Sequence, residues 1–128
     1  MPWTDDLTIG SNDEIWRRIA PSHVIRLPSG DYRPSSAAFR DSERAVSVHL
    51  AVLTTEADAL DGYPEHSLAG LRVGAPRNLG YVINRDPTPI DPSHAVLLVP
   101  TEWSDGQEQR ASRQLAIGCW WIRLRVPR

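Results

Sequence analysis

The segment AVSVHLAV, residues 45–52, decides the fold. Its apolar residues fall at every second position, namely Val46, Val48, Leu50 and Val52. Ser47 and His49 lie between them. Strict alternation has the period of a β-strand, so we expect one face to pack on a core and the other to be less apolar.

The segments on either side add strands and helices to this one. Strands are expected at residues 23–27, 67–73, 81–84, 94–99 and 119–126, because these runs are apolar or alternating and are bounded by turn residues. Three short helices are expected at residues 12–19, 54–60 and 107–117, with a single helical turn at 75–80. The chain is therefore predicted to be an α+β domain with one mixed or antiparallel sheet of five or six strands.

The helix expected at residues 12–19 rests on two signals. Ser11 and Glu14 have the spacing of a capping box, and Ile15, Trp16 and Ile19 form one apolar stripe. The ten residues before it are expected to be an N-terminal arm, docked by Trp3, Leu7 and Ile9. Residues 11–128 are expected to form a single domain.

Length and composition exclude several classes of protein. The chain has 128 residues and a net charge of −2, which argues against a generic nucleic-acid binder. Its one cysteine, Cys119, excludes an internal disulfide. No apolar run approaches the length of a membrane span, and the first residues lack the pattern of a signal peptide, so we expect a cytoplasmic protein. All 14 basic residues are arginine, which is typical of a GC-rich bacterial genome.

The stretch YRPSSAAFRD, residues 32–41, is the first candidate site. Arg33 precedes a proline and is therefore expected to be extended. Its guanidinium and the hydroxyls of Ser35 and Ser36 offer the donors of an anion clamp. The alternative is local: a serine caps a turn, and Arg33 pairs with a nearby acidic residue.

Two histidines extend this candidate site. His49 lies in the middle of the strand quoted first, and His94 opens a buried strand after a proline-rich loop. Histidine titrates near neutral pH, so the pair could serve as general acid and base. With Arg33, Ser35 and Ser36 they form the predicted catalytic set, the alternative being that each histidine only bonds its own surroundings. No metal site is expected, because the four histidines lack metal-ligand spacing.

The chain resembles a group of small uncharacterised bacterial proteins over about residues 11–100. The resemblance lies in IWRRIAPSHVI, GDYRPSSAAFRD and VSVHLA, together with LGYVINRDPTPIDPSHAVLLV. It implies that these segments belong to one unit, and it implies no activity.

A second resemblance, over about residues 14–60, is to ADP-ribosyltransferase-like toxins of the RES type. It implies NAD as a cofactor, held by Arg17 or Arg18, by the Arg33–Ser36 stretch and by Ser47. No acidic residue clearly takes the catalytic place of that family, and the candidates are Glu56 and Glu65.

The last segment, CWWIRLRV, residues 119–126, suggests a protein interface. On a regular strand Trp121, Arg123 and Arg125 share one face, and tryptophan and arginine are enriched at interfaces. We expect this face to meet a protein partner or a second copy of the chain. The alternatives are that a helix covers the tryptophan, or that the arginines protect a sheet edge from pairing.

The sequence leaves two functions open. The leading prediction is a small cytoplasmic accessory protein that acts with another gene product, without a cofactor and without a membrane. The alternative is a small enzyme related to ADP-ribosyltransferase-like or ribonuclease toxins, which would use the Arg/Ser/His pocket and, in the first case, NAD. A toxin–antitoxin or defence context fits either function.

Overall fold

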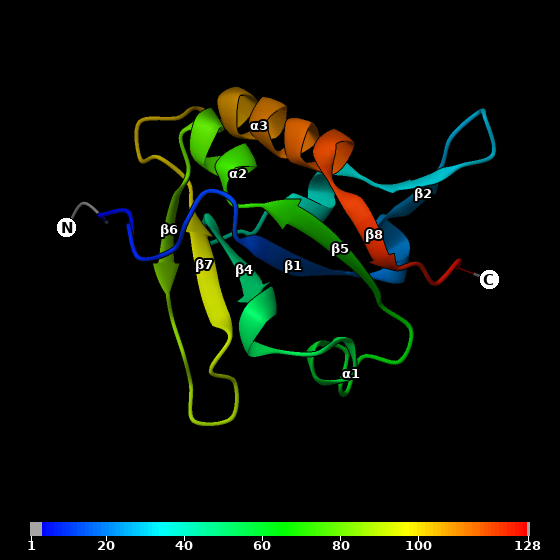
Figure 1. The fold of residues 1–128 in the computed structure, drawn as a ribbon. Helices are drawn as coiled ribbons and strands as arrows, with labels where there is room; N and C mark the ends of the chain where they lie inside the picture. The colour runs from blue at the N-terminus through cyan, green and yellow to red at the C-terminus, as the bar shows by residue number, and fades with distance from the viewer. Residues whose placement is uncertain (1–3, 128) are drawn as a thin grey trace.

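The computed structural model describes residues 4–127 and is built on a six-stranded antiparallel sheet. The strand order is β6-β7-β4-β1-β5-β8 (Figure 1). The strands are β1 (Glu14–Ile19), β4 (Ala45–Leu50), β5 (Ser67–Arg72), β6 (Val82–Arg85), β7 (His94–Leu98) and β8 (Trp120–Arg123). The predicted α+β class and the predicted strand number are confirmed.

A second sheet, not predicted, is a hairpin of β2 (Val24–Arg26) and β3 (Tyr32–Pro34). Two backbone hydrogen bonds flank this hairpin: Ser35 N–H donates to the His23 carbonyl, and Leu27 N–H donates to the Asp31 carbonyl. The Tyr32 carbonyl accepts a hydrogen bond from outside the hairpin, from the indole Nε1 of Trp121 at 3.0 Å. This bond ties the hairpin to the last strand of the main sheet.

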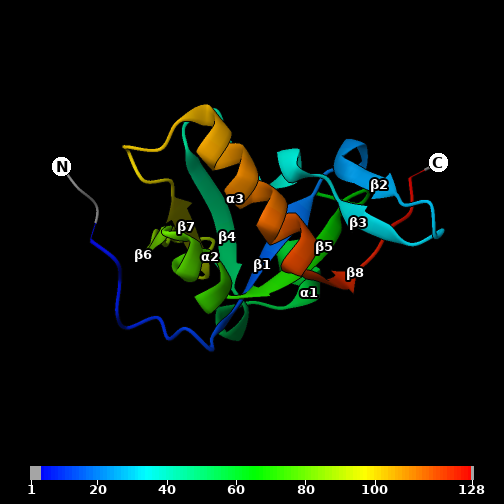
Figure 2. The same ribbon diagram turned by 90° about the horizontal axis from the view of Figure 1, so that it is seen from above.

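The described residues form three α-helices and three 3-10 turns. The helices are α1 (Glu56–Ala59), α2 (Gly74–Leu79) and α3 (Asp105–Gly118), and the turns are η1 (Pro21–His23), η2 (Ser36–Phe39) and η3 (Ala51–Leu53). Figures 1 and 2 show α2 and α3 on the same side of the sheet, with α1 on the other. Ser104 and Gln107 form a complete capping box at the start of α3.

The main core lies between α3 and the sheet. Val46, Val48 and Leu50 of β4 are buried in it, as the alternation predicts. Val52, expected on the same face, is exposed, because β4 ends at Leu50 and the chain turns into η3. None of the helices in residues 4–127 is both long enough and apolar enough to cross a membrane.

The helix expected at residues 12–19 is wrong, because Glu14–Ile19 of this segment form β1, an inner strand of the sheet. Ile15 and Ile19 are both buried, and a separation of four residues suits a strand face as well as a helix face. Asp13, not Ser11, bonds the local backbone, since its carboxylate accepts from Gly10 N–H at 2.8 Å. β1 pairs with β4 and β5, and this sheet pairing outweighs the local helix signals.

The N-terminal arm runs beside β6. Asp6 N–H donates to the Ile83 carbonyl at 2.9 Å, and Ile9 is fully buried. Leu7 is exposed, so it does not dock the arm. Trp3, also expected to dock, lies outside the described residues.

Candidate functional site

His49 is the centre of a polar network, which we call the His49 network: the buried His49 and Ser93 and the half-buried Arg18 and Asp91. His49 Nε2 lies 3.0 Å from an Arg18 nitrogen. On the other side of the ring, Nδ1 lies 3.1 Å from Ser93 Oγ and 3.3 Å from Asp91 Oδ2. Ser93 Oγ in turn donates to the Asp91 carboxylate at 2.6 Å.

The partners of His49 fix its protonation. A guanidinium nitrogen can only donate, so Nε2 of His49 accepts and the ring proton lies on Nδ1, facing Asp91 and Ser93. Burial lowers the pKa of His49 below its ordinary value, and the Arg18 cation lowers it further. His49 is therefore neutral near pH 7. It is only 4% exposed and both ring nitrogens are bonded, so no nitrogen remains for a substrate.

His94 lies next to this network, as the register of β4 and β7 requires. The two residues are directly opposite each other, and their rings are 6.3 Å apart, edge to face. His94 Nδ1 lies 3.0 Å from the Asp86 carbonyl and 3.1 Å from the Asp86 carboxylate. The two predicted histidines are thus brought together, each with a carboxylate beside its Nδ1.

Arg18 completes the network from the neighbouring strand β1. It also donates to the Ala59 carbonyl at 3.1 Å, and its guanidinium lies 4.0 Å above the centre of the Tyr63 ring. The side chain therefore links the sheet to the end of α1 and the loop that follows. These contacts describe a bracing role for Arg18.

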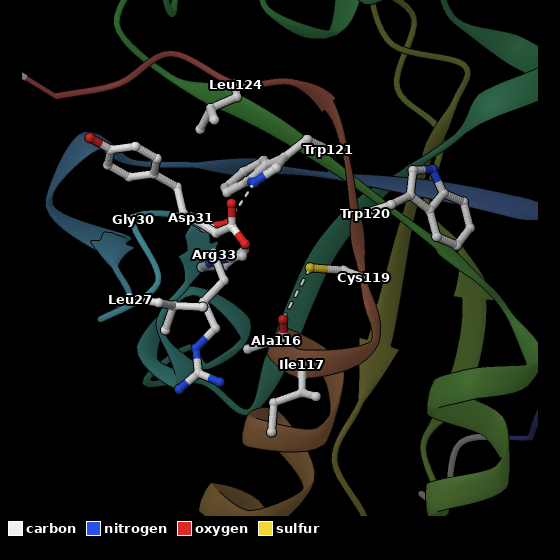
Figure 3. Close-up of a pocket in the computed structure, with 12 residues that line it drawn as sticks. Leu27, Gly30, Asp31, Arg33, Ala116, Ile117, Cys119, Trp120, Trp121 and Leu124 are labelled. Atoms are coloured by element: carbon white, nitrogen blue, oxygen red, sulfur yellow. Dashed lines mark hydrogen bonds between the residues drawn. The ribbon is translucent and has the colours of Figure 1, made fainter.

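Arg33 lies at the other edge of the sheet, away from the histidines. It lines a groove of about 560 Å³ between the hairpin, the end of α3 and β8 (Figure 3). We call this the hairpin groove. Its lining residues are Leu27, Gly30, Asp31, Tyr32, Arg33, Pro34, Ala116, Ile117, Cys119, Trp120, Trp121 and Leu124.

The hairpin groove combines an apolar and aromatic lining with one charged side chain of each sign, Asp31 and Arg33. Among residues 4–127, the buried Nε of Arg33 has no hydrogen-bond acceptor. Burial raises the pKa of Cys119 to about 11, so its thiol is not ionised near pH 7, and Sγ donates to the Ala116 carbonyl. The groove is therefore suited to binding and not to thiolate chemistry.

The two serines of the predicted catalytic set lie elsewhere. Ser35 precedes η2 and its hydroxyl is buried, with no partner within the described part of the chain. Ser36 lines a separate shallow depression with Arg40 and Asp41. Neither serine caps η2 with its side chain. The structure thus joins only His49 and His94 of the five predicted residues.

Of the residues that the RES-type resemblance assigns to NAD, Arg17 and Ser47 are in contact, but Arg33 does not join them. Arg17 is half-buried, and its guanidinium donates to the carbonyls of Ala38 at 2.9 Å and Ser47 at 2.8 Å. Those bonds occupy Arg17 within the fold. Arg33 belongs to the hairpin groove, and Glu56 pairs with Arg123.

The face predicted for Trp121, Arg123 and Arg125 is divided by a β-bulge. Trp121 is opposite Ala69, but Arg123 is opposite Leu68, so β8 advances by two residues where β5 advances by one. Trp121 therefore packs on the main core, whereas Arg123 pairs with Glu56 of α1. Arg125 donates to the carbonyls of Tyr63 and Pro64.

Asp91 and Ser93 are functional candidates that sequence reasoning missed. They lie in the segment RDPTPIDPS, residues 85–93, whose prolines and aspartates indicate a loop. Leu50 N–H donates to the Ser93 carbonyl, which brings this loop to the end of β4. The signal that could have found them is the run Asp-Pro-Ser-His, since it places a carboxylate and a hydroxyl directly before a candidate histidine.

Comparisons with protein-family models, with curated proteins and with solved structures find no match to this chain. Both resemblances described above remain predictions.

Proposed function

We propose that this chain is a small cytoplasmic bacterial accessory protein that binds another protein through the hairpin groove. The observation that supports this most is the groove itself, an apolar and aromatic hollow at the edge of the sheet that Arg33 also lines. Its volume of about 560 Å³ lies within the range typical of binding sites. Aromatic residues and arginine are also the side chains that dominate binding energy at protein interfaces.

The His49 network offers less to a ligand. His49 is buried, and its donors and acceptors are matched inside the chain. Such a network rigidifies the fold when it is complete. We therefore assign it to stability and the groove to function.

Photo-crosslinking tests this proposal. Ile117 lines the groove and is 53% exposed, whereas Val52 is 81% exposed in η3, at the end of β4. A benzoylphenylalanine at position 117, in the natural host, should give a distinct crosslinked protein that the same group at position 52 does not give. No crosslink from position 117, or the same products from both positions, would contradict the proposal.

A second candidate function is an enzyme that uses His94 as acid or base. It is supported by one observation: Nδ1 of His94 faces the Asp86 carboxylate, which leaves Nε2 for proton transfer. The substrates to test are NAD and RNA, as the sequence suggested.

A further inference from the structure

We propose that the contact between His49 and Arg18 is a pH-sensitive latch, which holds residues 54–66 on the sheet near pH 7 and releases them on acidification. We call these residues the α1 segment. They include α1, which lies on the side of the sheet away from α2 and α3 (Figures 1 and 2). The inference goes beyond the proposed function, because it concerns neither the hairpin groove nor its partner.

One nitrogen of Arg18 joins His49 to the α1 segment. Nη1 of Arg18 donates to Nε2 of His49 at 3.0 Å and to the Ala59 carbonyl, at the end of α1, at 3.1 Å. A protonated His49 carries a hydrogen on Nε2, so it presents a donor and a positive charge to that same nitrogen. A guanidinium offers no acceptor in return. Protonation therefore drives Nη1 away from the ring, and the bond to Ala59 is lost with it.

The charges around His49 make Arg18 the side that gives way. The charged and titratable groups that act on His49 are Arg17 and Arg18 of β1, His94 of β7 and Asp91 of the loop before β7. The Asp91 carboxylate lies 3.3 Å from Nδ1, so a protonated ring is attracted to that side. The ring is repelled from Arg18 on the Nε2 side. The loop therefore keeps its hold on His49 while the arginine is displaced.

A second histidine, in the α1 segment itself, acts in the same direction. The Arg18 guanidinium lies 4.0 Å from the centre of the Tyr63 ring, and the His66 ring meets the Tyr63 ring edge to face at 5.0 Å. Burial lowers the pKa of His66, and the cations of Arg18 and Arg125 lower it further. Acid therefore adds two positive charges near Arg18, one on His49 and one on His66.

The other contacts of the α1 segment are modest. Ala59 and Leu60 are its buried apolar residues, and they belong to a small cluster separate from the main core. Two arginines near the C-terminus bind the segment from the surface, and such exposed contacts contribute little to stability. α1 has only four residues and depends on its packing. The bond from Arg18 is therefore a large part of what holds the segment in place.

Hydrogen exchange of the full chain at pH 7, 6 and 5 tests this inference. The amides of Ala59 and Leu60 bond within the α1 segment, to the carbonyls of Thr55 and Glu56, whereas the β4 amides bond within the sheet. After correction for the intrinsic exchange rates, protection of the α1-segment amides should fall about tenfold or more between pH 7 and pH 5, because opening takes up a proton. The β4 amides should stay more strongly protected at pH 5.

Two variants identify the histidine responsible. His49→Gln retains an acceptor for Arg18 and a donor for Asp91 but does not titrate, so it should lose most of the pH response, with the remainder due to His66. His23→Gln, in η1, is the matched control and should keep the response of the unchanged chain.

Three results would overturn the latch. The first is constant protection of the α1 segment from pH 7 to pH 5. The second is equal protection of the α1 segment and β4 in the unchanged chain at pH 5, because the whole fold would then open together. Both results come from the unchanged chain, so they do not depend on how a variant folds. The third is a pH response that a folded His49→Gln variant retains in full.

Discussion

The His49 network and the hairpin groove both gather polar and cationic side chains, but only the first is closed. In the network, Arg18 donates to His49, and His49 faces Asp91 and Ser93, so each group has its partner within the chain. In the groove, the buried Nε of Arg33 has no acceptor among the described residues. The difference teaches that residue type alone does not mark a site. What matters is whether the fold itself satisfies the group.

The two regions also lie at different places in the sheet. The network joins β1, β4 and the loop before β7, which are inner elements of the strand order. The groove lies at the β8 edge, where the hairpin leaves a hollow against α3. Inner positions are closed by their neighbours on both sides, whereas an edge leaves room for another molecule.

The largest expected effect comes from opening the network. Asp91→Ala removes the acceptor of both Ser93 and His49, and should cost about 1–2 kcal/mol of unfolding free energy in a urea titration. Asp31→Ala, on the exposed hairpin turn of the groove, should stay within about 0.5 kcal/mol of the unchanged chain. Equal losses in the two variants would contradict the distinction between a closed and an open region.

Acidification should weaken the network by a smaller amount. The pKa of His49 in the folded state lies below its ordinary 6.5, so the unfolded chain binds more protons there. The stabilising contribution is complete above about pH 6.5 and is lost as the pH falls below it. Denaturation at pH 7, 6 and 5 should therefore show decreasing stability.

His49→Gln is the variant that sharpens this prediction. It should flatten the pH dependence between pH 7 and 5, although not completely, because burial also lowers the pKa of His66. A pH profile unchanged by His49→Gln would show that the network does not couple protonation to folding.

The smallest expected effect is that of candidate substrates. If the network is structural, neither millimolar NAD nor micromolar RNA should raise the melting temperature, because neither binds preferentially to the folded state. A reproducible rise with either one, abolished by His94→Ala, would favour the enzyme over the accessory protein.

Several parts of the fold could be predicted because one physical signal dominated locally. Strict alternation predicted β4, and the helix expected at residues 107–117 corresponds to α3. β1 could not be predicted, because the spacing of Ile15 and Ile19 fits a strand and a helix equally. Its strand pairing depends on β4 and β5, which are distant in sequence.

The candidate site was less predictable for the same reason. The register that places His49 opposite His94 is a property of the assembled sheet. The bulge that separates Trp121 from Arg123 leaves no local mark in the sequence, since both residues suit a regular strand. The hairpin groove forms from segments about 90 residues apart, as the bond from Trp121 to Tyr32 shows.

The central claim is that the hairpin groove binds a partner protein and that the His49 network stabilises the fold. One comparison tests this claim most directly. Two tagged variants, Ile117→Asp in the groove and His94→Ala directly beside the His49 network, are expressed in the natural host with the unchanged chain, and the copurifying proteins are quantified. The account predicts that Ile117→Asp, an exposed position in the groove, loses the partner while its melting temperature is retained, and that His94→Ala keeps the partner. A partner that is kept by Ile117→Asp and lost by a folded His94→Ala would contradict the account.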